Sequence, residues 1–194
     1  AGGAGAGYVG PVAGYPELLL VAVDDAMAAA WDRVAECRPW VRVFRGSVTE
    51  LEVDAVVSPA NSFGWMRGGI DGVYSRWLPG IEDRVRAAIT AEHGGELPVG
   101  SALIVPTGAA RPGWLISAPT MRTPGERLSA DGTAAGAAAT AILLAWRDGT
   151  LPDGRPARDV ISSLALPGLG TGVGGLAPQV CAARVNEALR TVLP

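Results

Sequence analysis

The chain has 194 residues, 48% of them hydrophobic and 18% charged, so it can bury a sizeable core as one globular domain without disulfides or a structural metal. Its formal net charge of −3 argues against nucleic acid as the main partner. Two isolated cysteines and a single histidine exclude a zinc site and histidine-based catalysis. The apolar stretches are too short to span a bilayer and no secretory signal opens the chain, so we expect a cytoplasmic protein with no membrane partner.

Residues 1–15 contain many glycines and alanines and no charge, which predicts a flexible tail, and residues 16–194 are expected to form one domain. Apolar residues alternate with arginine over 40–44, as in a half-exposed strand, whereas the run 53–57 is almost wholly apolar, as in a buried central strand. The predicted elements of this half are strands over 18–23, 40–44 and 53–57 and helices over 25–37 and 81–91.

The second half repeats this rhythm. Its predicted elements are strands over 102–105, 114–118 and 160–166 and helices over 132–146 and 177–192. Strands that alternate with helices predict an α/β protein, a three-layer sandwich with a largely parallel sheet.

Two glycine-rich stretches, 58–72 and 167–175, each follow a buried strand and lead into a helix. In open α/β sheets, ligands bind where strands end and helices begin. Consecutive glycines let backbone N–H groups converge on an anion, and the helix that follows adds its positive N-terminal end. Two such loops could hold a diphosphate without a lysine or a metal.

Three other interpretations of these loops compete. Residues 170–175 satisfy GxGxxG, but a dinucleotide site also requires a second strand with an acidic residue about 20 positions on, where this chain is still helical and ends. A P-loop requires a lysine, and none follows either loop. The third interpretation is that both loops are only turns in a glycine-rich protein.

Taken in order, the motifs of this chain resemble those of the macrodomain family. They occupy residues 46–49, 53–61, 68–72, 98–102 and 166–175, and the resemblance covers roughly residues 40–192. It implies an α/β/α sandwich with a mixed sheet, ADP-ribose or an ADP-ribosylated protein as partner, and no cofactor or metal. It also implies hydrolysis of a mono-ADP-ribosyl bond or of an O-acyl-ADP-ribose ester. The alternatives are a non-catalytic reader of ADP-ribosylated partners and a structural module that has lost the pocket.

By this resemblance Asn61 and Asp71, ten positions apart, face the distal ribose and form the expected catalytic pair. The expected ligand-binding residues are Ser47, Val48, Phe63, Trp65, Gly68, Gly69, Ile70, Gly168, Gly170, Thr171, Gly172 and Val173. Asn61 is also a common turn former and Asp71 a common first-turn acid. Phe63 and Trp65 are either part of the ligand wall or plugs that pack their loop onto the core.

The chain departs from the family pattern at several of these positions. Ser47 stands where an acidic residue usually reads the adenine amino group, and Ser58 stands where the pattern has the first asparagine of a pair. Met66 and Arg67 replace two glycines, and Gly174 replaces an aromatic residue. Because a hydroxyl cannot supply a charged acceptor, we expect adenine recognition that is weaker or differently built.

Overall fold

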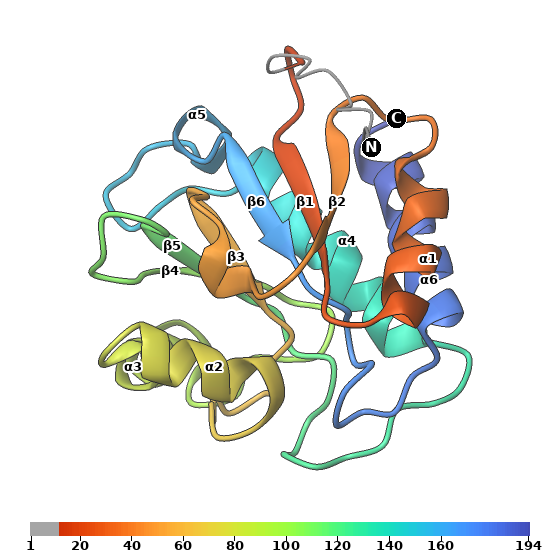
Figure 1. Cartoon of the computed structure of the whole chain (residues 1–194). Coiled ribbons are helices and arrows are strands. Elements are labelled where there is room, and N and C mark those ends of the chain that lie inside the picture. Colours follow the sequence, from red (N-terminus) through yellow and green to blue (C-terminus); the bar gives the residue numbers. More distant parts are fainter. Residues whose placement is uncertain (1–11) are drawn as a thin grey trace.

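A computed structural model describes residues 12–194 and shows a central sheet with helices on both faces (Figure 1). Residues 1–11, most of the predicted tail, lie outside the described residues. Tyr15, at the end of that stretch, stacks on Trp40 with ring centroids 4.7 Å apart.

The sheet has six strands in the order β2-β1-β6-β3-β5-β4. The strands are β1 (Glu17–Ala22), β2 (Val41–Arg45), β3 (Ala55–Ser58), β4 (Leu103–Pro106), β5 (Trp114–Ser117) and β6 (Ser163–Leu166). Only β4 runs antiparallel, beside β5, and all other neighbours are parallel. The mixed, largely parallel sheet is therefore confirmed.

Helices cover the two faces of the sheet as separate layers. One layer contains α1 (Asp25–Ala35), α4 (Thr133–Asp148) and α6 (Pro178–Val192), and the other contains α2 (Gly69–Trp77) and α3 (Ile81–His93). Alternate residues of β1 show this division, because Leu18 and Leu20 belong to the first core and Leu19 and Val21 to the second. The predicted three-layer α/β/α sandwich is confirmed. No helix within residues 12–194 is both long and apolar enough to cross a membrane.

The predicted strand over 160–166 begins too early. Val160 ends the short helix α5 (Ala157–Val160), and the N–H of Ile161 donates to the carbonyl of Ala157 at 2.8 Å, which closes a helical turn. The strand starts only at Ser163. Apolar character alone could not separate the two, because Val160 and Ile161 suit a strand as well as a buried helical turn.

The amino-terminal ends of β3 and β6 are joined through Asp54. Its Oδ2 accepts hydrogen bonds from the backbone N–H groups of Ser162 and Ser163 and from the Ser163 hydroxyl, each at 3.0 Å. Its own N–H donates to the Ser163 hydroxyl at 2.9 Å. The Asp54 N–H thus donates to a side chain rather than to a neighbouring strand, and β3 begins at the next residue, Ala55.

We expect Asp54→Asn to lower the free energy of unfolding by about 1–3 kcal/mol, because hydrogen bonds to a charged acceptor become bonds to a neutral amide. Chemical denaturation at neutral pH measures this change. Asp159→Asn is the matched control, because that carboxylate is 64% exposed and pairs only with Arg158 at 3.8 Å. It should change the unfolding free energy by less than about 0.5 kcal/mol. Equal effects of the two substitutions would contradict the assignment.

Candidate functional site

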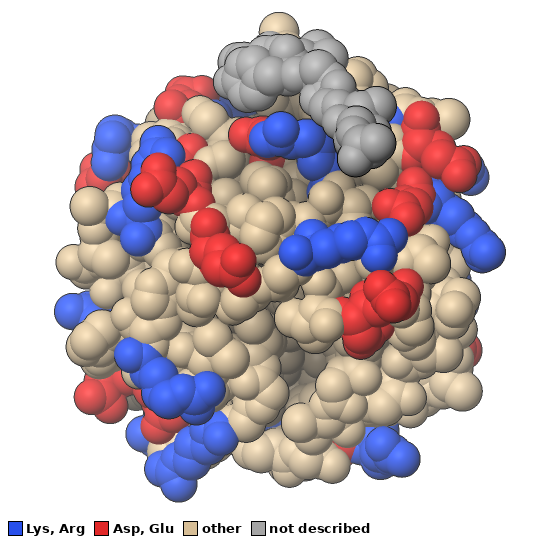
Figure 2. All heavy atoms as spheres, viewed as in Figure 1, with Lys and Arg blue, Asp and Glu red and all other residues tan. Residues whose placement is uncertain are grey.

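A cavity of about 720 Å³ opens at the carboxyl ends of the parallel strands. Its walls are Val21, Val23, Asp24, Met27, Ser47, Val48, Pro59, Ala60, Asn61, Trp65, Arg67, Gly68, Gly69, Ile70, Asp71, Val73, Met121, Pro124, Gly125, Pro167, Gly168, Gly170, Thr171, Gly172, Val173 and Gly174. The volume suits a small-molecule ligand, since such sites span roughly 300–1,000 Å³. Figure 2 shows that the lower centre of the face viewed in Figure 1 carries few charged side chains. The cavity contains every predicted site residue except Phe63.

The loop after β6 lines this cavity and leaves several of its backbone N–H groups unpaired among the described residues. Within the described residues, the N–H groups of residues 170–174 donate to no protein acceptor. The loop is nevertheless held firmly, because the N–H of Leu169 donates to Cys181 Sγ at 3.2 Å and that of Leu176 to the Gly170 carbonyl at 3.0 Å. Gly170 has φ +71°, a conformation that side chains disfavour. Such a run of unpaired N–H groups is an anion-binding arrangement.

The amino-terminal end of α2 forms the facing wall. Gly68 caps this helix without a side-chain hydrogen bond, so the first-turn N–H groups remain free, as at any uncapped helix start. Val173 Cγ2 would lie 3.9 Å from a Cβ placed on Gly69, which shows how closely the two loops approach. The cavity therefore receives the positive end of a helix and a second set of donors from the facing loop.

The loop between β3 and α2 is held in shape by Asn61. Its Oδ1 accepts from the N–H groups of Phe63 at 3.2 Å and Trp65 at 3.3 Å, and its Nδ2 donates to the Trp65 carbonyl at 2.7 Å. Glu82 of α3 accepts from the N–H of Met66 at 2.8 Å. Asn61 thus acts as a turn former, as one interpretation of the sequence held, while also lining the cavity. One Nδ2 hydrogen remains for a ligand.

Asp71 lies in the first turn of α2 and is 7% exposed. Burial raises the pKa of its carboxyl to about 6, the hydrogen bond from Ser58 lowers it, and the charge of Glu82 raises it. The Ser58 hydroxyl donates to Asp71 Oδ1 at 2.6 Å. Within residues 12–194, Oδ2 accepts no hydrogen bond and is not sealed from solvent. The protein therefore orients one oxygen of the Asp71 carboxylate and leaves the other available to a ligand or a water.

Trp65 contributes an aromatic wall beside these groups. Arg86 lies over its ring with Cζ 3.6 Å from the centroid, and Arg67 lies at 4.5 Å. Cation–π contacts of this kind hold the indole in place. The structure thus places Trp65 in the wall of the cavity, as one of the two interpretations of the sequence requires.

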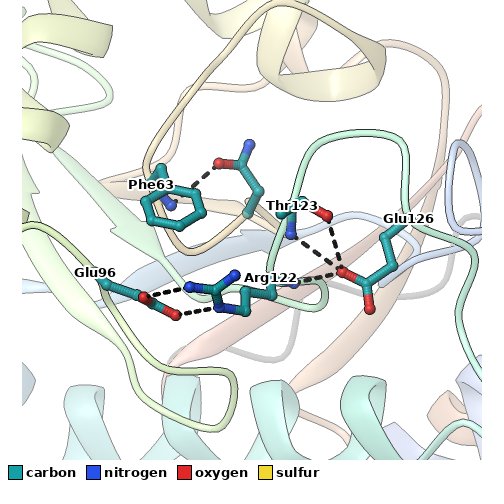
Figure 3. A network of polar contacts seen from close by, with 6 residues as sticks. Phe63, Glu96, Arg122, Thr123 and Glu126 are labelled. Carbon is teal, nitrogen blue, oxygen red and sulfur yellow. Dashed lines mark hydrogen bonds and ion pairs between the residues drawn. The ribbon is translucent and has the colours of Figure 1, made fainter.

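Phe63 does not line the cavity, contrary to its place among the predicted ligand-binding residues. It packs on Arg122, whose Cζ lies 5.3 Å from the ring centroid (Figure 3). Arg122 in turn makes two hydrogen bonds to Glu96, at 2.7 and 2.9 Å. The Phe63 ring therefore packs between its own loop and the segment around residue 122.

Ser47 and Val48 line the cavity at the end of β2, but the Ser47 hydroxyl is already engaged. It accepts from the N–H of Thr49 at 3.3 Å and lies 2.8 Å from the Thr49 hydroxyl, while the Ser47 N–H donates to Glu50 at 2.7 Å. This capping box begins the 3-10 turn η1 (Val48–Glu50).

Sequence reasoning missed the wall that β1 and α1 contribute, which includes Val21, Val23, Asp24 and Met27. These residues precede the stretch that carries the family resemblance. The signal that could have found them is positional, since the carboxyl end of every parallel strand in an open α/β sheet is a candidate ligand-binding position. Within the described residues, no group of three or more His, Cys, Asp or Glu side chains could hold a metal ion.

Comparison with known proteins gives consistent results. A family model described as "Macro domain" matches residues 57–185. An uncharacterized protein of Aquifex aeolicus is 34% identical over 154 residues, which cover 79% of this chain and 83% of that protein. A macro domain-containing protein of Streptomyces griseus is 33% identical over 159 residues, 80% of each chain.

Two solved structures have the same fold. The macrodomain of Mycobacterium tuberculosis DarG has a TM-score of 0.62 at 23% identity and covers 76% of this chain and 88% of its own. A macrodomain mutant of Oceanobacillus iheyensis, solved with ADPR (ADP-ribose), has a TM-score of 0.58 at 19% identity and covers 75% and 74%. With the family model matching most of the domain and these relatives beside it, the chain belongs to the macro domain family.

Proposed function

We propose that this protein binds ADP-ribose or a derivative and hydrolyses the bond that attaches ADP-ribose to a protein or to an acyl group. The observation that carries the proposal is the run of N–H groups at residues 170–174, which have no protein acceptor within residues 12–194 and share one cavity with the uncapped start of α2. A diphosphate has the charge and the acceptor oxygens that such a pair of walls would hold. The family relative solved with ADP-ribose supports the choice of ligand.

The diphosphate would divide the ligand between two ends of the cavity. The distal ribose would lie beside Asp71, Asn61 and Trp65, and the adenosine would extend toward β1 and β2. This orientation is the one implied by the family resemblance, and it sets the distal ribose against the one buried carboxylate in the cavity wall.

In the hydrolytic step, Asp71 Oδ2 would accept a hydrogen bond from a water aimed at the bond between the distal ribose and the acyl oxygen. The water oxygen bonds to the attacked carbon, and that carbon's bond to the leaving oxygen breaks. The electron pair stays with the leaving oxygen, and the proton lost by the water passes to Asp71. Fixing the diphosphate holds the carbon within reach, so positioning and electrostatics would supply most of the rate.

A second candidate is a reader that binds ADP-ribosylated partners without cleaving them. It is favoured by the hydrogen bonds of Asn61, whose Oδ1 and one Nδ2 hydrogen are engaged by its own loop. Only one hydrogen is left to hold the ribose, which suits binding better than the exact alignment that catalysis needs.

We expect ADP-ribose to bind with a micromolar dissociation constant, near −8 kcal/mol, in isothermal titration calorimetry. Gly172→Glu should abolish this binding because it places a negative charge in the diphosphate cradle. Gly172 is the better test position than Gly170, because a Cβ there meets no atom within 4 Å, whereas one at Gly170 would collide with Leu128. Gly172→Gln is the matched control of equal size and should retain most of the affinity. An absence of heat with millimolar ADP-ribose in the wild type would overturn the proposed function.

Ligand binding should change the tryptophan emission of the protein, and Trp65→Phe should remove most of that change. Trp65 is the tryptophan that lines the cavity. Trp114→Phe is the control, because Trp114 opens β5 at the opposite edge of the sheet. A full ligand response in the Trp65 variant would place this ring outside the site.

Hydrolysis should depend on ionised Asp71. Because burial raises the pKa of this carboxyl to about 6, the rate should rise with pH through that value and level off above it. Asp71→Ala should keep ADP-ribose affinity within about tenfold and lose about a hundredfold or more in turnover, the scale of a general base. Assays on mono-ADP-ribosylated protein and on O-acetyl-ADP-ribose, beside a binding titration, measure both quantities.

Ser58→Ala tests the same step through pH. The Ser58 hydrogen bond lowers the pKa of Asp71, so its loss should move the acid limb of the rate profile to higher pH while binding persists. Equal turnover by wild type and Asp71→Ala would remove Asp71 from the mechanism. Binding without turnover in the wild type would favour the reader.

A further inference from the structure

The part of the cavity formed by β1 and β2 has apolar walls and one charge. Val21, Met27 and Val48 are buried there, and Val23 is 80% exposed beside them. Among the cavity residues only Asp24 and Asp71 are acidic, and Asp24 belongs to this part. A ligand cavity with largely apolar walls and a single charged group is suited to a flat ring whose edge carries one complementary group.

Asp24 and Ser47 each follow the end of one of two paired strands, β1 and β2. β1 and β2 run parallel with Ala22 opposite Arg45, and the N–H of Gly46 donates to the Ala22 carbonyl at 3.0 Å. Two residues beyond this pair lie Asp24, after β1, and Ser47, after β2. Both residues line the cavity, so Asp24 supplies a carboxylate to a wall where Ser47 supplies only a hydroxyl.

Among the described residues, one carboxylate oxygen of Asp24 has no hydrogen-bond donor, whereas the Ser47 hydroxyl is already hydrogen-bonded. Asp24 Oδ1 accepts from the N–H of Met27 at 2.7 Å and caps α1. Within residues 12–194, its Oδ2 accepts no hydrogen bond, and no arginine pairs with the carboxylate. An ionised carboxylate offers about four acceptor positions, so capping the helix leaves the outer oxygen available.

The frame around Asp24 is rigid. The Trp31 indole donates to the Val21 carbonyl at 3.1 Å, which ties α1 to the end of β1. Met27 packs against the second glycine loop, with its sulfur 3.0 Å from a Cβ placed on Gly168. The carboxylate is therefore held in position before a ligand arrives, which favours a specific contact.

We propose that Asp24 accepts a hydrogen bond from the exocyclic amino group of adenine and thereby selects adenine over a base with a carbonyl at that position. The proposal rests on the proposed function and names the group that reads the base at that site. The adenine ring would lie between the apolar side chains of β1 and η1, with its amino edge toward Asp24. A carbonyl edge would instead face a carboxylate oxygen, acceptor against acceptor.

Calorimetric titration with ADP-ribose and with its hypoxanthine counterpart tests this, using wild type, Asp24→Asn and Asp25→Asn. Asparagine is as good a helix N-cap as aspartate, so Asp24→Asn should fold normally, which a thermal melt verifies. Asp25→Asn removes a neighbouring charge that pairs with Arg45 outside the cavity and serves as the matched control.

We expect the wild type and Asp25→Asn to prefer ADP-ribose by about tenfold to a hundredfold, the range for one charge-assisted hydrogen bond. Asp24→Asn should lose most of that preference through weaker ADP-ribose binding. Equal affinity of the wild type for the two nucleotides, or an unchanged preference in Asp24→Asn, would overturn this inference and leave the proposed function standing. Binding of neither nucleotide by the wild type would overturn both.

Discussion

The unpaired backbone donors of the β6–α6 loop are the feature on which the rest of the site depends. Residues 170–174 leave their N–H groups without protein partners among the described residues, although the loop is anchored through Leu169 and Leu176. Gly172 and Val173 are exposed, so the donors of this part of the loop are open to solvent or to an anion. Because the parallel strands end at one edge, the same cavity also receives the start of α2 and the ends of β1 and β2.

The burial that raises the pKa of Asp71 also lowers the stability of the fold when the carboxyl is ionised. Its folded-state pKa of about 6 lies above the ordinary value of 3.8. The folded protein therefore binds more protons than the unfolded chain between these values, and the free energy of unfolding falls as the pH rises through this range. At neutral pH the carboxylate is charged and destabilises the fold that buries it. The hydrogen bond from Ser58, where the family pattern has asparagine, reduces this effect and orients one oxygen. Perturbed groups of this kind gather at functional sites.

The two ends of the cavity also differ in how they are built. One end is formed by the loop between β3 and α2, which carries Asn61, Trp65 and Met66. Hydrogen bonds within the loop, Glu82 and the arginines around Trp65 hold it in place. At the other end the frame is the β1–α1 junction, held by Trp31 and capped by Asp24. The β2 loop has no charged group at Ser47, whereas the cavity wall has one at Asp24, the N-cap of α1.

The sequence by itself determined the α/β class, nearly every strand and helix, the two glycine loops and the family, because these depend on local periodicity and on short ordered motifs. It could not decide where Phe63 points or that β6 starts only at Ser163, and only the position of Asp24 after a parallel strand hinted that it belongs to the cavity. Phe63 lies outside the cavity wall, with its ring against Arg122, which is 59 positions away in the chain. Asp24 reaches the cavity because β1 pairs in register with β2. Contacts between distant segments and the pairing of strands are properties of the packed chain, which local patterns do not encode.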